Sequence, residues 1–256
     1  RMKGKYQRGK QSVFQYLRMT SIVNPHATIS LVVRDRDGEV YEQGSWKRTT
    51  DKLPRVVEEI KPHPHGIQLG TLQRMLRESE ERKMTSFLRH NFSGVSMRAA
   101  KEILSLAEIN ENRSPKRIST NDANGMLNGF QNVKLLPPPT DCLSPIDDLL
   151  IKKGLSKAID SRFAATVTRN PTVSQGNPFQ IEVGLVFGGD LTADGPIEVF
   201  RFANRVPLMY QQGGCALTKA IESIDWKRYG LDHPGGKGLP KGAAAVLIHL
   251  ASTNVQ

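Results

Sequence analysis

The chain has 256 residues, of which 38% are hydrophobic, and it carries a formal net charge of +11 at pH 7. This length and composition predict about two folded domains and exclude an intrinsically disordered chain. Because no run of about eighteen apolar residues occurs, we expect no transmembrane helix and no membrane partner. The two distant cysteines, Cys142 and Cys215, argue against a disulfide framework or a zinc site, so we predict buried thiols in a cytosolic protein.

The excess positive charge lies in the first half of the chain. Residues 1–118 contain 23 Lys and Arg against 13 Asp and Glu, whereas residues 119–256 contain 13 against 12. Lysine and arginine in excess bind polyanions by neutralising phosphates and releasing counterions. The composition therefore favours a nucleic acid as partner over an acidic protein, although ribosomal and nucleoid proteins share this feature.

The N-terminal segment is predicted to contain one helix and one β-hairpin. Residues 10–19 have helical spacing, and the segment closes at Pro25. The apolar residues expected on one side of this helix are Val13, Phe14, Leu17 and Met19. Strands are expected at 28–33 and 39–46 around an Asp-Gly turn. Because a lone hairpin is marginally stable, this segment is expected to be the end of a larger domain.

Two prolines alternate with two histidines in the segment Lys61–Gly66. The prolines restrict φ and disfavour helix before them, so we predict an extended linker at a domain boundary. His63 and His65 could instead bind a metal, but no third ligand is near them in the sequence, and the linker interpretation is favoured.

A small all-helical domain is predicted next, with helices at 69–79, 84–91, 96–107 and 120–130. Ser119 or Thr120 is the expected N-cap of the last helix, and residues 92–96 form a glycine turn. Its predicted core is formed by Leu72, Met75, Leu76, Phe87, Leu88, Phe92, Val95, Ala99, Ala100, Ile103 and Leu104.

The last part of the chain is predicted to be an α/β domain. A helix is expected at 146–159, interrupted by Gly154, and another at 215–224. The expected strands are 163–169, 179–187, 197–202 and 243–251. In the expected strand 179–187 apolar residues occupy every odd-numbered position. This alternation predicts that the odd-numbered side chains are buried and the even-numbered ones face solvent. A helix packed on one side of a mixed sheet is the expected result.

Two phrases in this domain carry a family resemblance. They are Arg201-Phe-Ala-Asn-Arg-Val-Pro-Leu-Met-Tyr210 and Trp226-Lys-Arg-Tyr229. Together with Lys61-Pro-His-Pro-His-Gly66 and Gly176-Asn-Pro-Phe-Gln-Ile-Glu-Val-Gly184, in the same order, they resemble the B subunit of DNA topoisomerase VI. The resemblance implies an α+β multidomain chain, truncated at both ends relative to that family.

The resemblance implies a specific domain order. Residues 1–60 resemble the end of a GHKL-type ATPase domain plus a linker, and residues 61–136 resemble a helix-two-turns-helix domain. Residues 137–256 resemble an incomplete transducer domain of the ribosomal-S5-like α/β type. The implied function is that of a type IIB topoisomerase B subunit, which couples ATP-driven dimerisation to DNA cleavage and strand passage by the A subunit.

The resemblance also implies partners and a location. The family's partners are duplex DNA, the topoisomerase VI A subunit, and a second B subunit in an A2B2 assembly. ATP and magnesium serve the full-length family, but no ATP contact is expected in this chain, which we predict to be inactive by itself. The expected location is the cytoplasm, associated with the nucleoid, or the nucleus if the source is eukaryotic.

Candidate DNA contacts fall in two places. Long cationic side chains around the predicted helical core can contact phosphates without reading bases, although solvated surface charge is the rival explanation. These candidates are Arg74, Arg77, Lys83, Arg89, Arg98 and Lys101. The second set is Trp226, Lys227, Arg228 and Tyr229, where two aromatics and two cations suit phosphate contact with stacking. From composition alone Trp226 and Tyr229 fit a core anchor better; the family resemblance favours DNA.

No catalytic, cofactor-binding or metal-binding residue is predicted. His249 lies in a buried strand with no nucleophile motif beside it, so no catalytic triad is assigned. The glycine-rich segment 235–242 lacks the spacing of a phosphate-binding loop. Two alternatives remain: a DNA-binding or strand-break accessory protein without ATPase function, and a mismatch-repair-type GHKL protein, which would lack the inserted helical domain.

Overall fold

The computed structural model describes residues 6–35, 37–56 and 59–255, and divides the chain into two compact units. The first, here called the sheet unit, contains Arg1–Val56, Ser144–Asn170 and Gln180–Ala251. The second, the helical unit, contains Val57–Leu143, Pro171–Phe179 and Ser252–Gln256. The basic residues at positions 1, 3 and 5, and Arg36 of the hairpin turn, lie outside the described residues.

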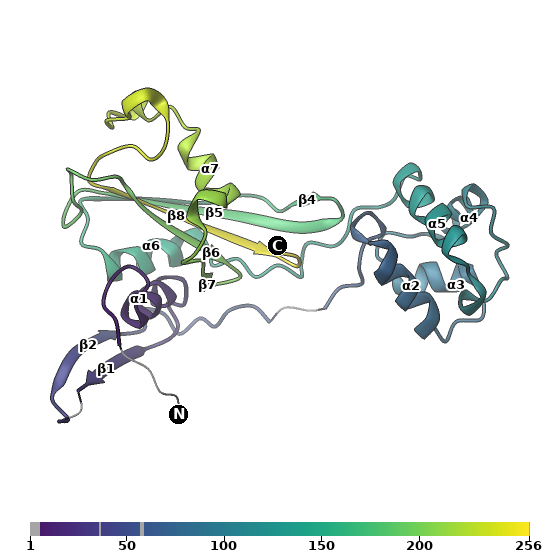
Figure 1. The fold of residues 1–256 in the computed structure, drawn as a ribbon, viewed down its shortest axis with the longest axis horizontal. Coiled ribbons are helices and arrows are strands. Elements are labelled where there is room, and N and C mark those ends of the chain that lie inside the picture. Colours follow the sequence, from purple (N-terminus) through teal and green to yellow (C-terminus); the bar gives the residue numbers. More distant parts are fainter. Residues whose placement is uncertain (1–5, 36, 57–58, 256) are drawn as a thin grey trace. The chain divides into compact units, whose positions relative to one another are not determined.

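A mixed sheet forms the centre of the sheet unit (Figure 1). Its strand order is β3-β5-β8-β6-β7, and the short strand β4 pairs with the first residues of β5, which belong with β4 to the helical unit. β6 and β8 are parallel, whereas β3 and β4 pair with β5, and β7 with β6, in antiparallel fashion. The strands are β3 Phe163–Thr168, β4 Thr172–Ser174, β5 Asn177–Phe187, β6 Glu198–Ala203, β7 Val206–Pro207 and β8 Ala244–Ser252.

Helices cover both faces of this sheet, which corrects the expectation of a single helical layer. Helices α1 (Val13–Val23) and α6 (Asp148–Ala158) lie on one face, and α7 (Ala216–Glu222) lies on the other (Figure 1). On the first face, Ile151 and Leu155 of α6 pack in one core with Phe202 of β6. The second buries Val246 and Ile248 against Ile221. Both faces of β8 are therefore buried.

The side-chain alternation predicted for β5 is reversed in the structure. Gln180, Glu182, Gly184 and Val186 are the buried positions, whereas the odd-numbered residues are half-buried and Phe187 is exposed. Gly184 permits this arrangement, because a Cβ there would lie 2.5 Å from Cδ1 of Leu155 on α6. Gln180 and Glu182 thus lie on the α6 side together with Val186, whereas Ile181, Val183 and Leu185 lie on the other side of the sheet.

Gly154 does not interrupt helix α6, contrary to the prediction. It is buried inside the helix, and a Cβ at this position would collide with the backbone carbonyl of Ile22 in α1. The glycine therefore marks the place where two helices touch through their backbones. Arg18 reinforces the same contact by donating from Nη2 to the carbonyl of Ala158, 2.9 Å away.

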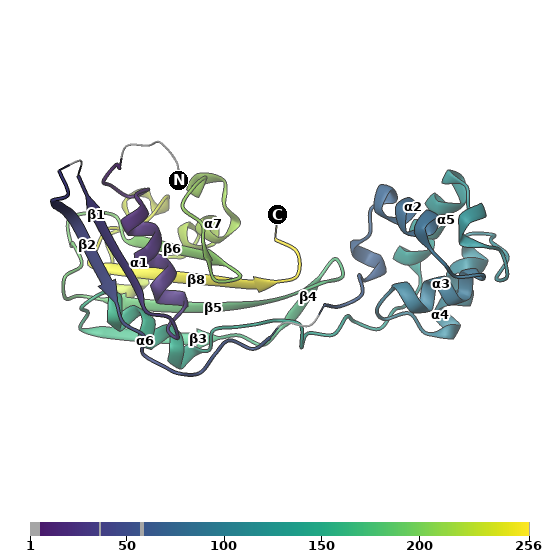
Figure 2. The same ribbon diagram turned by 90° about the horizontal axis from the view of Figure 1, so that it is seen from below.

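The predicted hairpin follows α1 and packs beside it (Figure 2). Strands β1 (Ile29–Arg34) and β2 (Val40–Trp46) are antiparallel. Trp46 is buried, and its ring lies 5.2 Å from that of Phe14. Val13 was predicted on the buried side of the helix, but it is 53% exposed.

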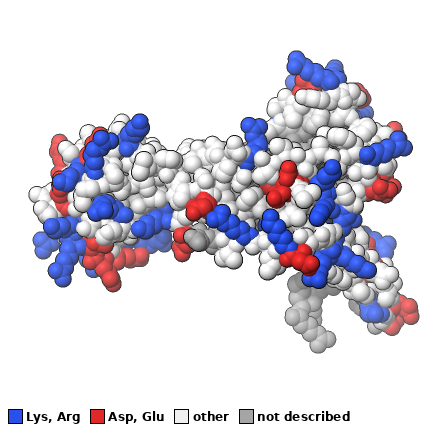
Figure 3. Space-filling view, turned by 180° about the vertical axis from the view of Figure 1, so that it is seen from behind, with Lys and Arg blue, Asp and Glu red and all other residues white. Residues whose placement is uncertain are grey.

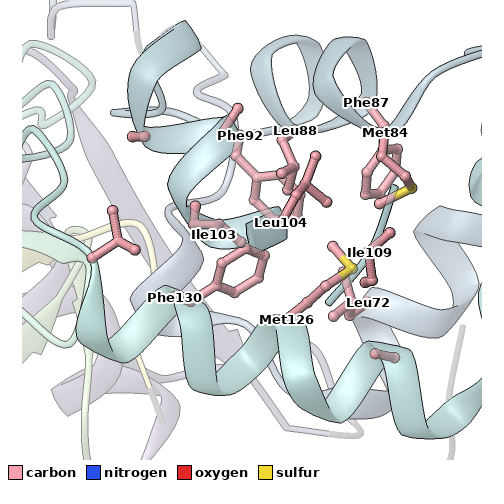
Figure 4. Packing of buried hydrophobic residues seen from close by; sticks show 14 of the residues in the cluster. Leu72, Met84, Phe87, Leu88, Phe92, Ile103, Leu104, Ile109, Met126 and Phe130 are labelled. Carbon is pink, nitrogen blue, oxygen red and sulfur yellow. The ribbon is translucent and has the colours of Figure 1, made fainter. Parts of the chain in front are cut away.

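The helical unit has the elements that its periodicity predicts, with a single packed core (Figure 4). Its longer helices are α2 Leu69–Glu78, α3 Met84–Asn91, α4 Met97–Leu106 and α5 Thr120–Asn132. Ser96 and Ser119 cap α4 and α5, and Ser119 forms a capping box with Asp122. Every predicted core residue belongs to the hydrophobic cluster, with Met75 and Val95 partly buried at its edge.

The segment Lys61–Gly66 is more structured than a linker. It contains a 3-10 turn, Pro64–Gly66, and His63 is buried at 5% exposure. The Nε2 atom of His63 lies 3.0 Å from the carbonyl oxygen of Leu136, while Nδ1 accepts the N–H of His65. Burial lowers the pKa of His63, and the partners of its two nitrogens fit the neutral ring. This histidine therefore has a structural role in the helical unit.

Candidate nucleic-acid interface

The turn Trp226–Tyr229 is a short 3-10 helix that follows α7 in the sheet unit. It ends at Gly230, whose φ of 76° closes the turn. Lys227 and Arg228 are exposed at its tip. Arg228 forms an ion pair with Asp225, 3.0 Å from Nε to Oδ2, but both side chains are largely exposed and such pairs are weak. Both cations can therefore reach a phosphate.

The two aromatic residues of this turn have different positions. Trp226 is buried, and its Nε1–H donates to the carbonyl of Ile221 at 2.8 Å. Tyr229 is 73% exposed, and its ring centroid lies 6.3 Å from that of Trp226 in an edge-on arrangement. Trp226 thus anchors the turn, whereas Tyr229 is free to stack against a ligand.

An open apolar cavity of about 420 Å³ lies beneath the turn. Phe163, Leu185 and Phe187 form its floor on the sheet, and the turn forms one wall. Phe163 and Phe187 are half-exposed, at 55% and 46%. Sequence reasoning missed this cavity because it assumed that the odd-numbered residues of β5 are buried.

The six cationic residues predicted to contact DNA in the helical unit are all exposed, and they lie on or next to helices α2, α3 and α4. Arg74 and Arg77 share α2, Lys83 precedes α3, and the others lie on α3 and α4. Lys101 pairs with Glu111 at 3.5 Å, the only acidic partner recorded for the six among the described residues. In the view of Figure 3 the helical unit carries basic side chains with acidic ones among them.

The glycine turn between α3 and α4 is held by a contact within the helical unit. Gly94 has φ of 74°, and a Cβ there would collide with the carbonyl oxygen of Leu136. The N–H of Leu136 donates to the carbonyl of Gly94 at 3.1 Å. The need for glycine at this position is therefore explained by packing.

A buried polar network in the sheet unit was not predicted. The carboxylate of Glu182, fully buried in β5, accepts from the N–H groups of Ile146 and Asp147, both at 2.7 Å. It also accepts from the hydroxyl of Thr168 at 2.9 Å and pairs with Nδ1 of His249 at 2.7 Å. Desolvation would raise the pKa of Glu182, but these donors hold it below its ordinary value.

Arg205 completes this network from the β6–β7 turn. Asn204 and Arg205 have φ of 46° and 65°, the left-handed conformation of a tight hairpin turn. The backbone N–H of Arg205 donates to Nε2 of His249 at 3.0 Å. Its guanidinium donates to the carbonyl of Val23 and to that of Pro145, each at 2.9 Å. The same residue thus contacts β8, α1 and the start of α6.

Arg201 uses a similar arrangement close to the β6–β7 hairpin. It is 3% exposed, and Nη2 donates to the carbonyls of Leu208 and Tyr210 at 2.9 and 3.0 Å. Cys215 lies beside it. Burial would raise the pKa of this thiol, but hydrogen bonds from Arg201 and from the backbone of Thr218 and Leu217 hold it below its ordinary value.

The glycine-rich segment 235–242 does not fit a nucleotide phosphate. Phosphate loops lead into a helix N-terminus, whereas this segment leads into strand β8. The carbonyl of Gly238 lies 3.0 Å from Nε2 of His233, which closes the loop on itself. Among the described residues no group of three or more metal-binding side chains is found, and no helix is long and apolar enough to cross a membrane.

Comparison with known proteins defines the class to which this architecture belongs. Residues 138–256 match the family described as "Topoisomerase VI B subunit, transducer", so the mixed sheet with α6 and α7 is a transducer domain. The similarity continues through the rest of the chain. The chain belongs to the family of DNA topoisomerase VI B subunits, and the resemblance indicated by Arg201–Tyr210 is confirmed.

Relatives match nearly the whole chain. It is 48% identical over 255 residues to the B subunit of type 2 DNA topoisomerase 6 from Methanococcoides burtonii and 49% identical to that from Methanosarcina barkeri, in each case over 99% of this chain. The Archaeoglobus fulgidus protein of the same name is 46% identical over 96% of it. The chain spans 40% of the length of these relatives.

Proposed function

We propose that this chain acts as part of the B subunit of a type IIB DNA topoisomerase. In this role the sheet unit passes a rearrangement driven by ATP to the A subunit, which cleaves one duplex so that a second can pass. The observation that supports the proposal is the similarity to a type 2 DNA topoisomerase 6 B subunit over 99% of the chain. The chain's partners would then be duplex DNA, the A subunit of the enzyme and a second B subunit.

The finer domain assignment belongs to the same proposal. Helix α1 with the β1–β2 hairpin would be the end of a GHKL-type ATPase domain, and helices α2 to α5 would be a helix-two-turns-helix domain. ATP with magnesium would serve the assembled enzyme, and we assign no residue of this chain to either. The protein would work in the cytoplasm, associated with the nucleoid.

We further propose that the tip of the Trp226–Tyr229 turn contacts DNA. Lys227 and Arg228 supply positive charge, and exposed Tyr229 can pack against a sugar or a base. Trp226 contributes by holding the turn. The exposed cations of the helical unit are a second set of phosphate contacts, used without base recognition.

The 256-residue chain is expected to bind duplex DNA in low salt and to hydrolyse no ATP. Binding is measured by fluorescence anisotropy of a labelled duplex, and hydrolysis by phosphate release. Together with the A subunit, the complete B subunit should relax supercoiled DNA only when ATP is present. ATP hydrolysis by the chain alone would contradict our assignment, and ATP-independent binding by a complete B subunit that never relaxes DNA would favour an accessory protein.

Replacing both Lys227 and Arg228 with alanine is expected to weaken duplex binding and to flatten its dependence on salt. Each lost phosphate contact lowers the slope of log affinity against log salt by about 0.9. The matched control is Lys152→Ala with Lys153→Ala, an adjacent exposed pair on α6 that removes the same charge. Equal slopes for the two double variants would show that the turn makes no specific contact.

A further inference from the structure

The β6–β7 turn connects helix α1 to the sheet through one side chain. The last residue of α1 is Val23, and carbonyls at a helix C-terminus lack partners inside the helix. The carbonyl of Val23 receives the Nη1–H of Arg205 at 2.9 Å. A guanidinium is well suited to this position, since it stays charged and its planar fork can serve two acceptors at once.

The second acceptor is the carbonyl of Pro145, just before α6. The next two N–H groups, of Ile146 and Asp147, are held by Glu182. Asp147 has φ of 91°, a conformation that non-glycine residues rarely adopt and that persists where the surroundings determine it. The start of α6 is thus fixed on one side by Arg205 and on the other by Glu182.

The network closes into a ring. Glu182 binds His249, whose Nε2 accepts the backbone N–H of Arg205, and the Arg205 side chain returns to Pro145 beside the residues that Glu182 holds. Because His249 gives Nδ1–H to Glu182 and accepts at Nε2, its imidazole is neutral, and the charges of Glu182 and Arg205 balance. A displacement of α1 that pulls on Arg205 therefore acts on strands β5 and β8 and on α6.

Packing makes this connection stiff. The backbones of α1 and α6 touch at Gly154, and Arg18 of α1 binds the carbonyl of Ala158 at the far end of α6. Interiors packed in this way transmit strain, because few voids can absorb a shift. Arg205 adds a side chain that binds the end of α1 and the segment before α6 at the same time.

We propose that Arg205 is a positioning residue that latches helix α1 to the transducer sheet and carries movement of α1 into it. The proposal rests on the proposed function for the source of that movement, whereas the latch itself belongs to the geometry of the sheet unit. Loss of the guanidinium removes this polar link between α1 and the sheet and leaves the apolar packing of Met19, Ile22 and Val23 in place.

The test compares Arg205→Asn with Arg201→Gln. Asparagine tolerates the positive φ of Arg205 and keeps the N–H that binds His249, so only the two side-chain bonds are lost. Arg201 is a matched control because its side chain also holds two backbone carbonyls, but both follow strand β7 and neither belongs to α1 or α6. Arg205→Lys keeps the charge and can hold one carbonyl at a time.

Hydrogen exchange of the 256-residue chain tests the latch directly. Arg205→Asn is expected to speed exchange of the α1 amides by about tenfold or more, since hydrogen bonds to a charged group are lost. Arg205→Lys should lie between this variant and the wild type. Arg201→Gln should leave α1 unchanged and speed exchange in β6 and β7. Unchanged α1 exchange in Arg205→Asn, or an equal rise in both variants, overturns the latch.

Coupling is tested in the complete enzyme, in which the full-length B subunit is paired with the A subunit. The readout is the number of strand-passage events per ATP hydrolysed, a ratio that loss of folded protein does not change. Arg205→Asn is expected to lower this ratio severalfold, and Arg201→Gln to leave it at the wild-type value. An unchanged ratio for Arg205→Asn overturns the coupling role. If the wild-type B and A subunits together pass no strands, the proposed function is wrong, and the coupling role of Arg205 is wrong with it. The hydrogen-exchange experiment would still test whether Arg205 holds α1 to the sheet.

Discussion

Replacing Glu182 with glutamine is expected to lower the free energy of unfolding of the sheet unit by about 2–6 kcal/mol, because two of its four donors lose their acceptor oxygen in the interior. The carboxylate accepts from two backbone N–H groups, from Thr168 and from His249. Glutamine offers one acceptor oxygen, and its amide would point N–H groups at other donors. Each donor left unpaired in the interior costs about 1–3 kcal/mol.

Tryptophan fluorescence during urea unfolding measures this loss cleanly. The sequence has two tryptophans, and both Trp46 and Trp226 belong to the sheet unit. The matched control is Glu198→Gln on β6, where the side chain is exposed and the change should stay within about 0.5 kcal/mol. A Glu182→Gln protein as stable as this control would show that the network contributes nothing.

The effect of Glu182→Gln on the free energy of unfolding is expected to depend on pH. Because the donors hold the pKa of Glu182 below its ordinary value of 4.5, the folded state favours the carboxylate. The stability that the carboxylate contributes is fully present above pH 4.5, the ordinary pKa of this group. It is lost as the pH falls through the lowered pKa of the folded state. The stability difference between wild type and Glu182→Gln should therefore shrink on acidification. A difference that grows instead would mean that Glu182 is protonated in the folded protein.

The helical unit could be predicted closely from sequence because its information is local. Apolar residues repeat with helical spacing, and residues such as Leu72, Phe87 and Ile103 are fully buried as that spacing predicts. Ser119 precedes its helix with Asp122 three residues later, which is a capping signal readable within one turn. No distant contact is needed to place these elements.

The buried network could not be predicted because its members are far apart in sequence. Glu182 and His249 are separated by 67 positions, and Arg205 reaches Val23 across 182. The alternation in β5 was misleading, since a period of two gives two faces but does not say which one is covered. The small residue Gly184 decided it, by admitting Leu155 of α6 onto the face that carries Glu182.

The candidate DNA contacts divide in the same way. Composition identified Lys227 and Arg228, and the structure places both at an exposed tip. Composition could not show that Trp226 is buried and Tyr229 exposed. The burial of Trp226 depends on its hydrogen bond to the carbonyl of Ile221 and on the apolar core between α7 and the sheet. The role of the turn in DNA binding stays a prediction.

Replacing Gly94 with alanine is expected to destabilise the helical unit by about 2–4 kcal/mol. Two costs add: about 1–2 kcal/mol for an L side chain at positive φ, and about 1–2 kcal/mol, in the lower part of the range for overpacking, for the contact with a rigid backbone. The obstacle is the carbonyl of Leu136, which cannot move easily because it lies 3.0 Å from Nε2 of His63. Its own N–H is bound to Gly94.

The helical unit contains no tryptophan, so circular dichroism of its helices follows this variant while fluorescence follows the sheet unit. The control is Gly70→Ala in α2, where a Cβ meets nothing within 4 Å and alanine should be neutral or stabilising by up to about 1 kcal/mol. Duplex binding by Gly94→Ala should fall only as far as its helical unit unfolds. Weak binding by a variant that is still fully folded would instead mean that the glycine turn itself touches the DNA backbone.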